Sequence, residues 1–365
     1  MNHVKFALPL LALALSGCGG GGSSYDIFHV SSSSSVVSGP FVVSSQSRST
    51  STPTWTVPSS SSRPSGTSSR TSSTYYTPEE KVKLGITPTQ IEHTNGLTYG
   101  LYPQDLVTSK ATIAGLTTLD SHDICLNGWY QYKGEYYAKV IATPYESALD
   151  GAYEYFIDGT AIKKGETYWF LVQPITWRIL TSNNNRHLLV TGGLLDKADC
   201  YYSSRNNRTI SGSTVYPNNY MYSSLRNQLT VSFYNTAFAL NDQYIPTVTV
   251  DNSASSIPGG NATYACPNTQ DKIFAFSYDE CGRTPYLNSE GSRVAMVSDY
   301  ARARGAWAAK ASDYVDYGNW WMRSPSNQSE DWACYNSYKG RRNSDYFVTV
   351  ESVCIRPGIY LDYRL

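Results

Sequence analysis

The chain has 365 residues, enough for one large or two ordinary domains. Its 29 basic and 29 acidic residues balance, so no polybasic field indicates a nucleic-acid partner, and we expect none. Charged residues make up only 16% of the chain, whereas tyrosine alone contributes 31 residues. This composition is typical of an extracytoplasmic protein and disfavours a coiled coil, a collagen, a helical bundle and a multi-span membrane protein.

Residues 1–17 have the pattern of a lipoprotein signal peptide. Lys5 precedes an apolar run of about ten residues, which is too short to cross a bilayer but suits a signal-peptide core. The run ends in Leu15-Ser-Gly-Cys18, which resembles a bacterial lipobox and implies cleavage before Cys18 and acylation of that residue. An ordinary signal peptide with an incidental cysteine is the alternative. We expect a lipid-anchored, extracytoplasmic protein of the cell envelope, at the outer membrane or the cell surface.

Residues 18–76 are expected to be the lipidated cysteine and a disordered linker. Serine occupies 22 of the 52 positions from 23 to 74, and Asp26 is the only acidic residue there. Such a segment buries too little apolar surface to offset the entropy of ordering. We interpret it as a tether that lifts the folded part away from the membrane.

The folded part is predicted to begin at residue 77. Thr77-Pro-Glu-Glu80 is typical of a capping box that opens a short helix, and residues 129–142 predict a hairpin that turns at 133–135. Residues 224–234 and 298–305 have helical patterns with serine caps. The further strand-like segments are 168–172, 175–180, 187–190, 320–325, 346–350 and 354–356. Many short strands, two or three short helices and long loops indicate an α+β fold.

Five motifs occur in order after residue 123. They are the hairpin at 129–140, Pro174-Ile-Thr-Trp-Arg-Ile-Leu180, the segments 223–238 and 271–280, and Trp320-Trp-Met-Arg-Ser-Pro325 with Cys354-Ile-Arg-Pro-Gly358. Together they resemble an uncharacterised bacterial domain family, known as a domain of unknown function. Met322, Cys354 and Gly358 stand where the family usually has Leu, Gly and Ala. The resemblance implies a C-type-lectin-like domain over 123–365, in which a long loop region carries the ligand surface, after an N-terminal extension over 77–122.

Some members of this family resemble the hypervariable targets of diversity-generating retroelements, in which Asn codons scatter into Tyr, Ser, Asp, Arg and similar residues. The segment between Pro325 and Arg356 has this alphabet, and Tyr, Ser and Asn serve as adaptable contacts in antibody paratopes. We expect a ligand-binding surface here, with a plain polar hairpin as the alternative. The candidate contact residues are Asn327, Asp331, Trp332, Tyr335, Asn336, Tyr338, Arg341, Arg342, Asn343, Asp345 and Tyr346.

Six cysteines remain when Cys18 is set aside. An even number in an exported chain favours disulfide bonds, and spacing leaves many connectivities open. We predict Cys266–Cys281 and Cys334–Cys354, since each pair brackets one loop or hairpin. No C-x-x-C pair occurs, so neither a thiol redox motif nor a structural zinc site is indicated.

Motifs for enzyme chemistry are absent from the sequence. His93, His122 and His187 form no metal-ligand spacing, and no G-x-S-x-G elbow occurs. Asp279 and Glu280 are adjacent, so on a strand they would face opposite sides. Calcium-binding tripeptides of the lectin type are also absent. We therefore predict no catalytic residue, no cofactor and no metal.

Arg323 and Arg356 are each flanked by apolar or aromatic residues and closely followed by proline. A charge in such a run must be paired or hydrogen-bonded if it is buried. We expect both to brace loop carbonyls or carboxylates rather than to bind a ligand.

The sequence thus favours a lipid-anchored surface protein with an adhesin-like or receptor-like binding module. Its expected partners are the membrane, through the anchor, and an unidentified protein or glycan. The alternative is a structural, envelope-organising lipoprotein without a specific ligand, and an enzyme comes third.

Overall fold

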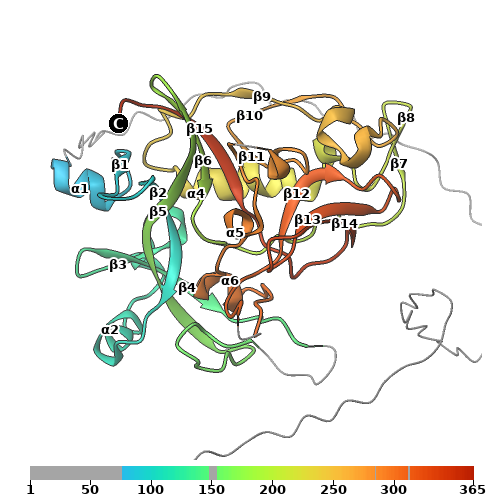
Figure 1. Cartoon of the computed structure of the whole chain (residues 1–365). Coiled ribbons are helices and arrows are strands. Elements are labelled where there is room, and N and C mark those ends of the chain that lie inside the picture. The colour runs from blue at the N-terminus through green and yellow to red at the C-terminus, as the bar shows by residue number, and fades with distance from the viewer. Residues whose placement is uncertain (1–75, 148–153, 284, 311–312) are drawn as a thin grey trace, which may run out of the picture. The chain divides into compact units, whose positions relative to one another are not determined.

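The structure is a computed structural model that describes residues 76–147, 154–283, 285–310 and 313–365 (Figure 1). The predicted signal peptide, Cys18 and nearly all of the linker lie outside these residues. The described residues fall in one compact unit, Thr71–Leu365, and combine many strands with few short helices, which confirms the α+β class. Within them, every helix is too short or too polar to cross a bilayer.

The largest element is an eight-stranded antiparallel sheet. Its main path runs β1-β2-β5-β6-β15-β11, and β4 pairs with β5 and with β3. The bounds are β1 (Thr89–Gln90), β2 (Gly96–Leu106), β3 (Tyr130–Tyr132), β4 (Glu135–Ile141), β5 (Thr167–Asn183), β6 (Arg186–Thr191), β11 (Ile273–Ala275) and β15 (Pro357–Asp362). The predicted hairpin at 129–142 is confirmed as β3 and β4.

β5 joins two segments that the sequence predicted as separate strands, 168–172 and 175–180. It continues through Pro174, which pairs with Leu101 of β2 at the end of a register shift that begins at Thr98. A proline removes one ladder donor, and a local irregularity in the partner strand accommodates that loss. The two predicted strands are therefore one long strand that carries β2, β4 and β6.

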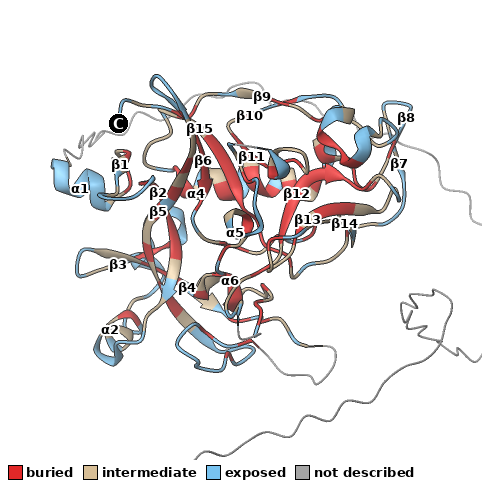
Figure 2. Cartoon of the chain, in the orientation of Figure 1, coloured by how far each residue is buried: buried red, intermediate tan, exposed pale blue. Residues whose placement is uncertain are grey.

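A second, three-stranded antiparallel sheet has the order β12-β13-β14, with β12 at Trp320–Pro325, β13 at Trp332–Asn336 and β14 at Arg342–Phe347. Every residue of β12 is buried, and Figure 2 shows β11 and β12 mostly in the colour of buried residues. The predicted strand 346–350 was placed too late, because β14 already pairs with β13 from Arg342 onward. Residues 354–356 form no named strand, although Cys354 makes isolated bridges to Lys197 and Trp320.

Two short ribbons, six short α-helices, one π-helical turn and six 3-10 turns complete the described part of the fold. The ribbons are β7–β8 and β9–β10, with bounds Arg208–Ile210, Ser213–Val215, Val248–Val250 and Thr269–Asp271. The α-helices are α1 (Pro78–Lys83), α2 (Lys110–Leu116), α3 (Ser224–Asn227), α4 (Tyr234–Ala237), α5 (Glu290–Arg293) and α6 (Asp299–Ala303), and a π-helical turn, Gln228–Phe233, joins α3 to α4.

The predicted helix signals are confirmed. Thr77 and Glu80 form both bonds of the capping box that opens α1. Ser223 caps the helix that begins at α3, and Leu225, Leu229 and Phe233 are buried along it. Its middle is π-helical rather than α-helical, which the apolar spacing does not reveal. Ser298 caps α6.

Arg323 of β12 is buried and braces three segments, as predicted. Its guanidinium forms two bonds to the Glu280 carboxylate, at 2.5 and 2.9 Å. It also donates to the carbonyl oxygens of Ala275 at 2.9 Å and Asp251 at 3.1 Å. All three nitrogens of this buried guanidinium therefore donate to an acceptor.

Arg356 is also buried and braces backbone, as predicted, but without a carboxylate. It donates to the carbonyl oxygens of Thr191 and Arg293, at 3.3 and 2.5 Å. Its guanidinium lies 5.2 Å from the ring centroid of Trp320, a cation–π distance. Two carbonyls and an aromatic face thus replace the water that this cation loses.

The Arg323–Glu280 pair gives stability a specific pH dependence. Burial alone would raise the pKa of Glu280, but the Arg323 charge and its hydrogen bonds outweigh burial and hold that pKa below its usual value. Because the folded-state pKa is depressed, the pair stabilises the fold above the unfolded-state pKa. This stabilisation disappears as the pH falls through the folded-state pKa.

We predict that Glu280→Gln lowers the free energy of unfolding by about 3 kcal/mol at neutral pH, because it leaves a buried cation unpaired. The deficit relative to the unmodified protein should shrink as the pH is lowered below about 4. Urea unfolding of the variant and the unmodified protein, from neutral pH to below pH about 4, measures this deficit. A deficit that is constant with pH would contradict the assignment of the charge pair.

Candidate ligand-binding cleft

The C-terminal hairpin presents a stacked pair of tyrosines. The ring centroids of Tyr335 on β13 and Tyr346 on β14 are 4.3 Å apart, and both rings contact Trp321 of β12. The pairing shifts register between Ala333 and Tyr335, with one extra residue on β14. A bulge of this kind reverses which residues face a given side, so both tyrosines lie on the same face of the sheet.

A second group of predicted contact residues lies with Arg205. Asp331 accepts a bond from the Arg205 Nε at 2.6 Å, and the guanidinium lies 3.8 Å from the ring centroid of Phe347. Trp332 packs edge-on against the same Phe347 ring at 5.9 Å. Asp331 and Trp332 are therefore held by the scaffold and do not join the tyrosine pair.

The remaining predicted residues are dispersed. Tyr338 packs against Trp307 and Tyr314, and Arg342 stacks on Tyr278 at 4.4 Å while donating to its carbonyl. Arg341 and Asp345 are exposed, whereas Asn327 and Asn343 are half-buried. The structure thus does not assemble all eleven residues into one surface.

Asn336 is a correction to the predicted contact set. Its side chain is fully buried, and its Nδ2 lies 3.5 Å from the Cys281 Sγ, within bonding distance for sulfur. It pairs with Trp320 of the buried strand β12 and therefore faces the core. Asn336 cannot contact a ligand on the hairpin surface.

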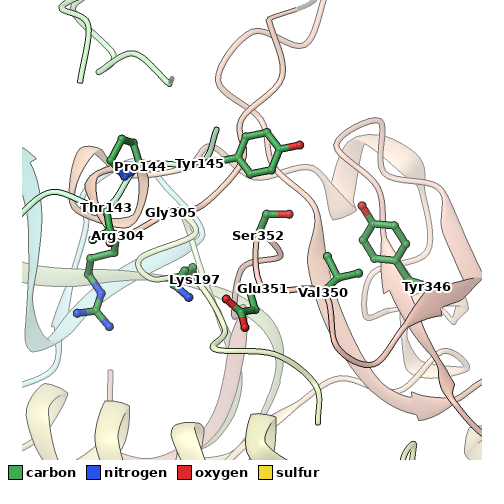
Figure 3. Close-up of a pocket in the computed structure, with 10 residues that line it drawn as sticks. All are labelled: Thr143, Pro144, Tyr145, Lys197, Arg304, Gly305, Tyr346, Val350, Glu351 and Ser352. Atoms are coloured by element: carbon green, nitrogen blue, oxygen red, sulfur yellow. The ribbon is translucent and has the colours of Figure 1, made fainter. Parts of the chain in front are cut away.

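Tyr346 lines a cavity of about 500 Å³, shown in Figure 3. Ligand cavities in proteins typically measure about 300 to 1,000 Å³. In Figure 3, Tyr145 and Tyr346 flank the opening, and Lys197 and Arg304 lie across it from Tyr346. The lining comes from segments far apart in the chain: 143–145, Lys197, 304–305, Tyr346 and 350–352.

Arg304 is a fixed positive charge in the cavity wall. Its Nε donates to Asp196 at 2.8 Å, and attraction to this buried carboxylate is the main reason that the pKa of Arg304 is raised. Asp196 also accepts from the Tyr102 hydroxyl at 2.7 Å and from the Lys197 backbone at 2.9 Å. The guanidinium lies 5.4 Å from the Tyr300 ring centroid, so the cation is both paired and stacked.

Several other groups in the cavity are available to a ligand. Thr143, Tyr145, Glu351 and Ser352 contribute further polar groups to its lining. The Lys197 Nζ is 3.9 Å from Asp199, a distance too long for a hydrogen bond. The cavity therefore offers polar donors and acceptors beside an aromatic ring, which is the chemistry of a polar binding site.

Neither predicted disulfide is formed in the structure, which holds all six cysteines of the described residues as free thiols. The Cys334 Sγ instead donates to the Pro325 carbonyl at 3.2 Å, and the Cys281 Sγ lies against Asn336. Two cysteines that flank one loop in the sequence do not necessarily have their sulfur atoms within bonding distance in the fold. The sulfurs of Cys281 and Cys334 contact other groups instead. Burial raises the pKa of Cys281 to about 12, so this thiol is a poor nucleophile at neutral pH.

Sequence reasoning found Tyr346 but missed Tyr145, Lys197, Arg304 and Glu351. A local signal existed only for Arg304, which lies within the predicted helix 298–305. Among the described residues, no three His, Cys, Asp or Glu side chains lie close enough to hold a metal ion. The expected absence of a cofactor stays a prediction.

Comparison with known proteins identifies one domain. A domain of unknown function, DUF6273, covers residues 184–363. This range includes both tyrosines of the hairpin and Arg304, and it begins later than the predicted boundary at 123. No curated protein and no solved structure matches the chain. The comparisons give no support for the lectin-like or retroelement relationship.

The free thiols generate a labelling prediction. Cys125 is exposed, whereas Cys281, Cys334 and Cys354 are fully buried. A maleimide should label Cys125 in the native protein and reach the three buried thiols only after unfolding in denaturant without reductant. Mass spectrometry counts the labels. Two or more cysteines that stay unlabelled until reductant is added would instead support the disulfide prediction.

Proposed function

We propose that this chain is a lipid-anchored surface protein whose folded part binds a ligand in an adhesin-like or receptor-like manner. The observation that carries the proposal is the position of Tyr346, which stacks on Tyr335 and lines a cavity of about 500 Å³. Arg304 and polar groups of three other segments line the same space. A rigid aromatic ring beside adaptable polar groups is a common composition of binding surfaces.

The lipobox ending at Cys18 and the serine-rich linker support the anchored, extracytoplasmic part of the proposal. The linker would hold the binding module at a distance from the membrane. The partner is a protein or a glycan, and the proposal includes no catalysis, cofactor or metal.

The finer proposal is that the domain is C-type-lectin-like and that its hairpin is diversified. The motif resemblance and the Tyr, Asn, Ser, Arg and Asp alphabet of residues 326–353 support it. A nearby reverse transcriptase gene with a near-copy of the codons for 320–356 would establish diversification, and its absence would favour a fixed binding surface.

The competing proposal is an envelope-organising lipoprotein without a specific ligand. It predicts that substitutions in the cavity leave the protein's affinity for envelope components unchanged. The second test below separates the two proposals.

The anchor prediction concerns Cys18→Ser, which removes the acylated thiol. The variant should leave the detergent phase for the aqueous phase in Triton X-114 partitioning, because acylation supplies its membrane affinity. Cys125→Ser is the matched control and should partition like the unmodified protein. Retention of Cys18→Ser in the detergent phase would contradict lipidation.

The binding prediction concerns Tyr346→Ala in the full chain. Its affinity for immobilised envelope extract should fall by a factor that corresponds to about 2 kcal/mol, the loss expected at a hot-spot tyrosine. Tyr155→Ala removes an exposed tyrosine outside the cavity and should leave the affinity unchanged. Thermal melts verify that both variants fold. Equal binding by the two variants would favour the competing structural proposal.

A further inference from the structure

Two further cavities share lining residues with the cavity beside Tyr346, and we refer to the three together as the groove. Arg304 also lines a neighbouring cavity of about 220 Å³, and Glu351 also lines one of about 670 Å³. These two neighbours share Asp199, Gln228 and Ser232 with each other. Cavities that share lining residues are neighbours. Each of the three is lined in part by residues of the segment 196–200, so all three lie beside this segment.

Hydrogen bonds and an ion pair hold the lining residues in place. The Gln228 Oε1 accepts from the Asp199 backbone at 2.9 Å, and its Nε2 donates to the Lys197 carbonyl at 2.8 Å. Gln228 lies in the π-helical turn, which places it and Ser232 on the groove. The Asp196–Arg304 pair fixes the same segment from the other side. The groove therefore exists before any ligand binds, which lowers the entropic cost of binding.

The lining of the groove contains many hydroxyl groups, and its positive and negative charges balance. Its lysine and arginines, Lys197, Arg226 and Arg304, are matched in number by Asp196, Asp199 and Glu351. Arg226 is moreover paired with Asp271 at 2.6 Å. Hydroxyls come from Thr143, Ser203, Ser224, Thr230, Ser232 and Ser352.

This composition discriminates between ligand classes. A phosphorylated or sulfated polymer would call for an excess of cations, which the groove lacks. A lipid would call for an apolar lining, and hydroxyl, amide and charged groups line most of this groove. A polyhydroxylated chain presents a donor and an acceptor at each hydroxyl and can use the mixed groups of the walls. The Tyr346 ring supplies a flat apolar face for the C–H face of one sugar ring.

We propose, resting on the ligand-binding function above, that the groove takes an extended, uncharged polysaccharide segment of several sugar units. One sugar lies against Tyr346, and the chain passes Glu351 toward Ser224 and Gln228. Glu351 lies at the junction of the two largest cavities, so its carboxylate accepts hydrogen bonds from sugar hydroxyls on both sides.

The test titrates the full chain in detergent with uncharged glucose, mannose and N-acetylglucosamine oligomers, from mono- to hexasaccharide, by isothermal calorimetry. For at least one series, affinity should rise with each added unit and level off once the groove is filled. Tyr346→Ala should weaken the longest bound oligomer about tenfold or more, the loss of one aromatic contact. Glu351→Gln, which loses the charge but keeps an acceptor, should weaken it less, by about threefold to tenfold.

Glu92→Gln is the matched control, because Glu92 is exposed and lies outside all three cavities. It should bind like the unmodified protein. Affinity that is independent of oligomer length, or saccharide binding that both groove variants leave intact, overturns the extended groove. Absence of binding in every saccharide series overturns the saccharide assignment.

A parallel panel of uncharged peptides separates this inference from the function on which it rests. Peptide binding that Tyr346→Ala abolishes, without saccharide binding, would refute the polysaccharide and retain a ligand-binding cleft. The proposed function itself fails when Tyr346→Ala and Tyr155→Ala bind envelope extract equally.

Discussion

The burial of the Arg323 guanidinium is the constraint on which the rest of the domain depends. A cation that is withdrawn from water must find acceptors, and here Glu280 and two carbonyls supply them. These acceptors belong to segments around residues 251, 275 and 280, so a single side chain ties three separate parts of the chain to β12. Any rearrangement of those segments would leave the charge in an apolar interior without acceptors. β12 is therefore held in one position.

The position of β12 determines where the side chains of the β13–β14 hairpin lie. Trp321 is fully buried in β12, and the stacked rings of Tyr335 and Tyr346 rest on it. On the far side of the cavity, Arg304 is held by Asp196 rather than free to search for a partner. Both walls are thus set before a ligand arrives, and binding would order few side chains.

Local patterns predicted local structure well, because capping boxes, serine caps and the apolar β12 run depend on neighbouring residues. The cleft depends on residues such as Tyr145 and Glu351, which no spacing connects. The predicted contact residues included Asn336 because they were chosen by residue type, and residue type does not specify which face of a strand a side chain occupies. Asn336 directly follows Tyr335 on β13, so strand alternation puts the two side chains on opposite faces, and only the packed structure shows that the Asn336 face is the buried one. The cysteine prediction failed to match the structure for a related reason, since an even count says nothing about where sulfurs point.

The turn of the hairpin is attached to the scaffold through its backbone. The Arg293 guanidinium donates to the Gly340 carbonyl in the β13–β14 turn, and the Arg293 carbonyl accepts from both Arg356 and Trp320. A side chain at position 340 would meet the backbone of Glu290, so glycine is required there. These bonds use no side chain of the hairpin surface. Exposed positions such as Arg341 and Asp345 can therefore change without releasing the turn, which is the physical condition that a variable binding surface has to meet.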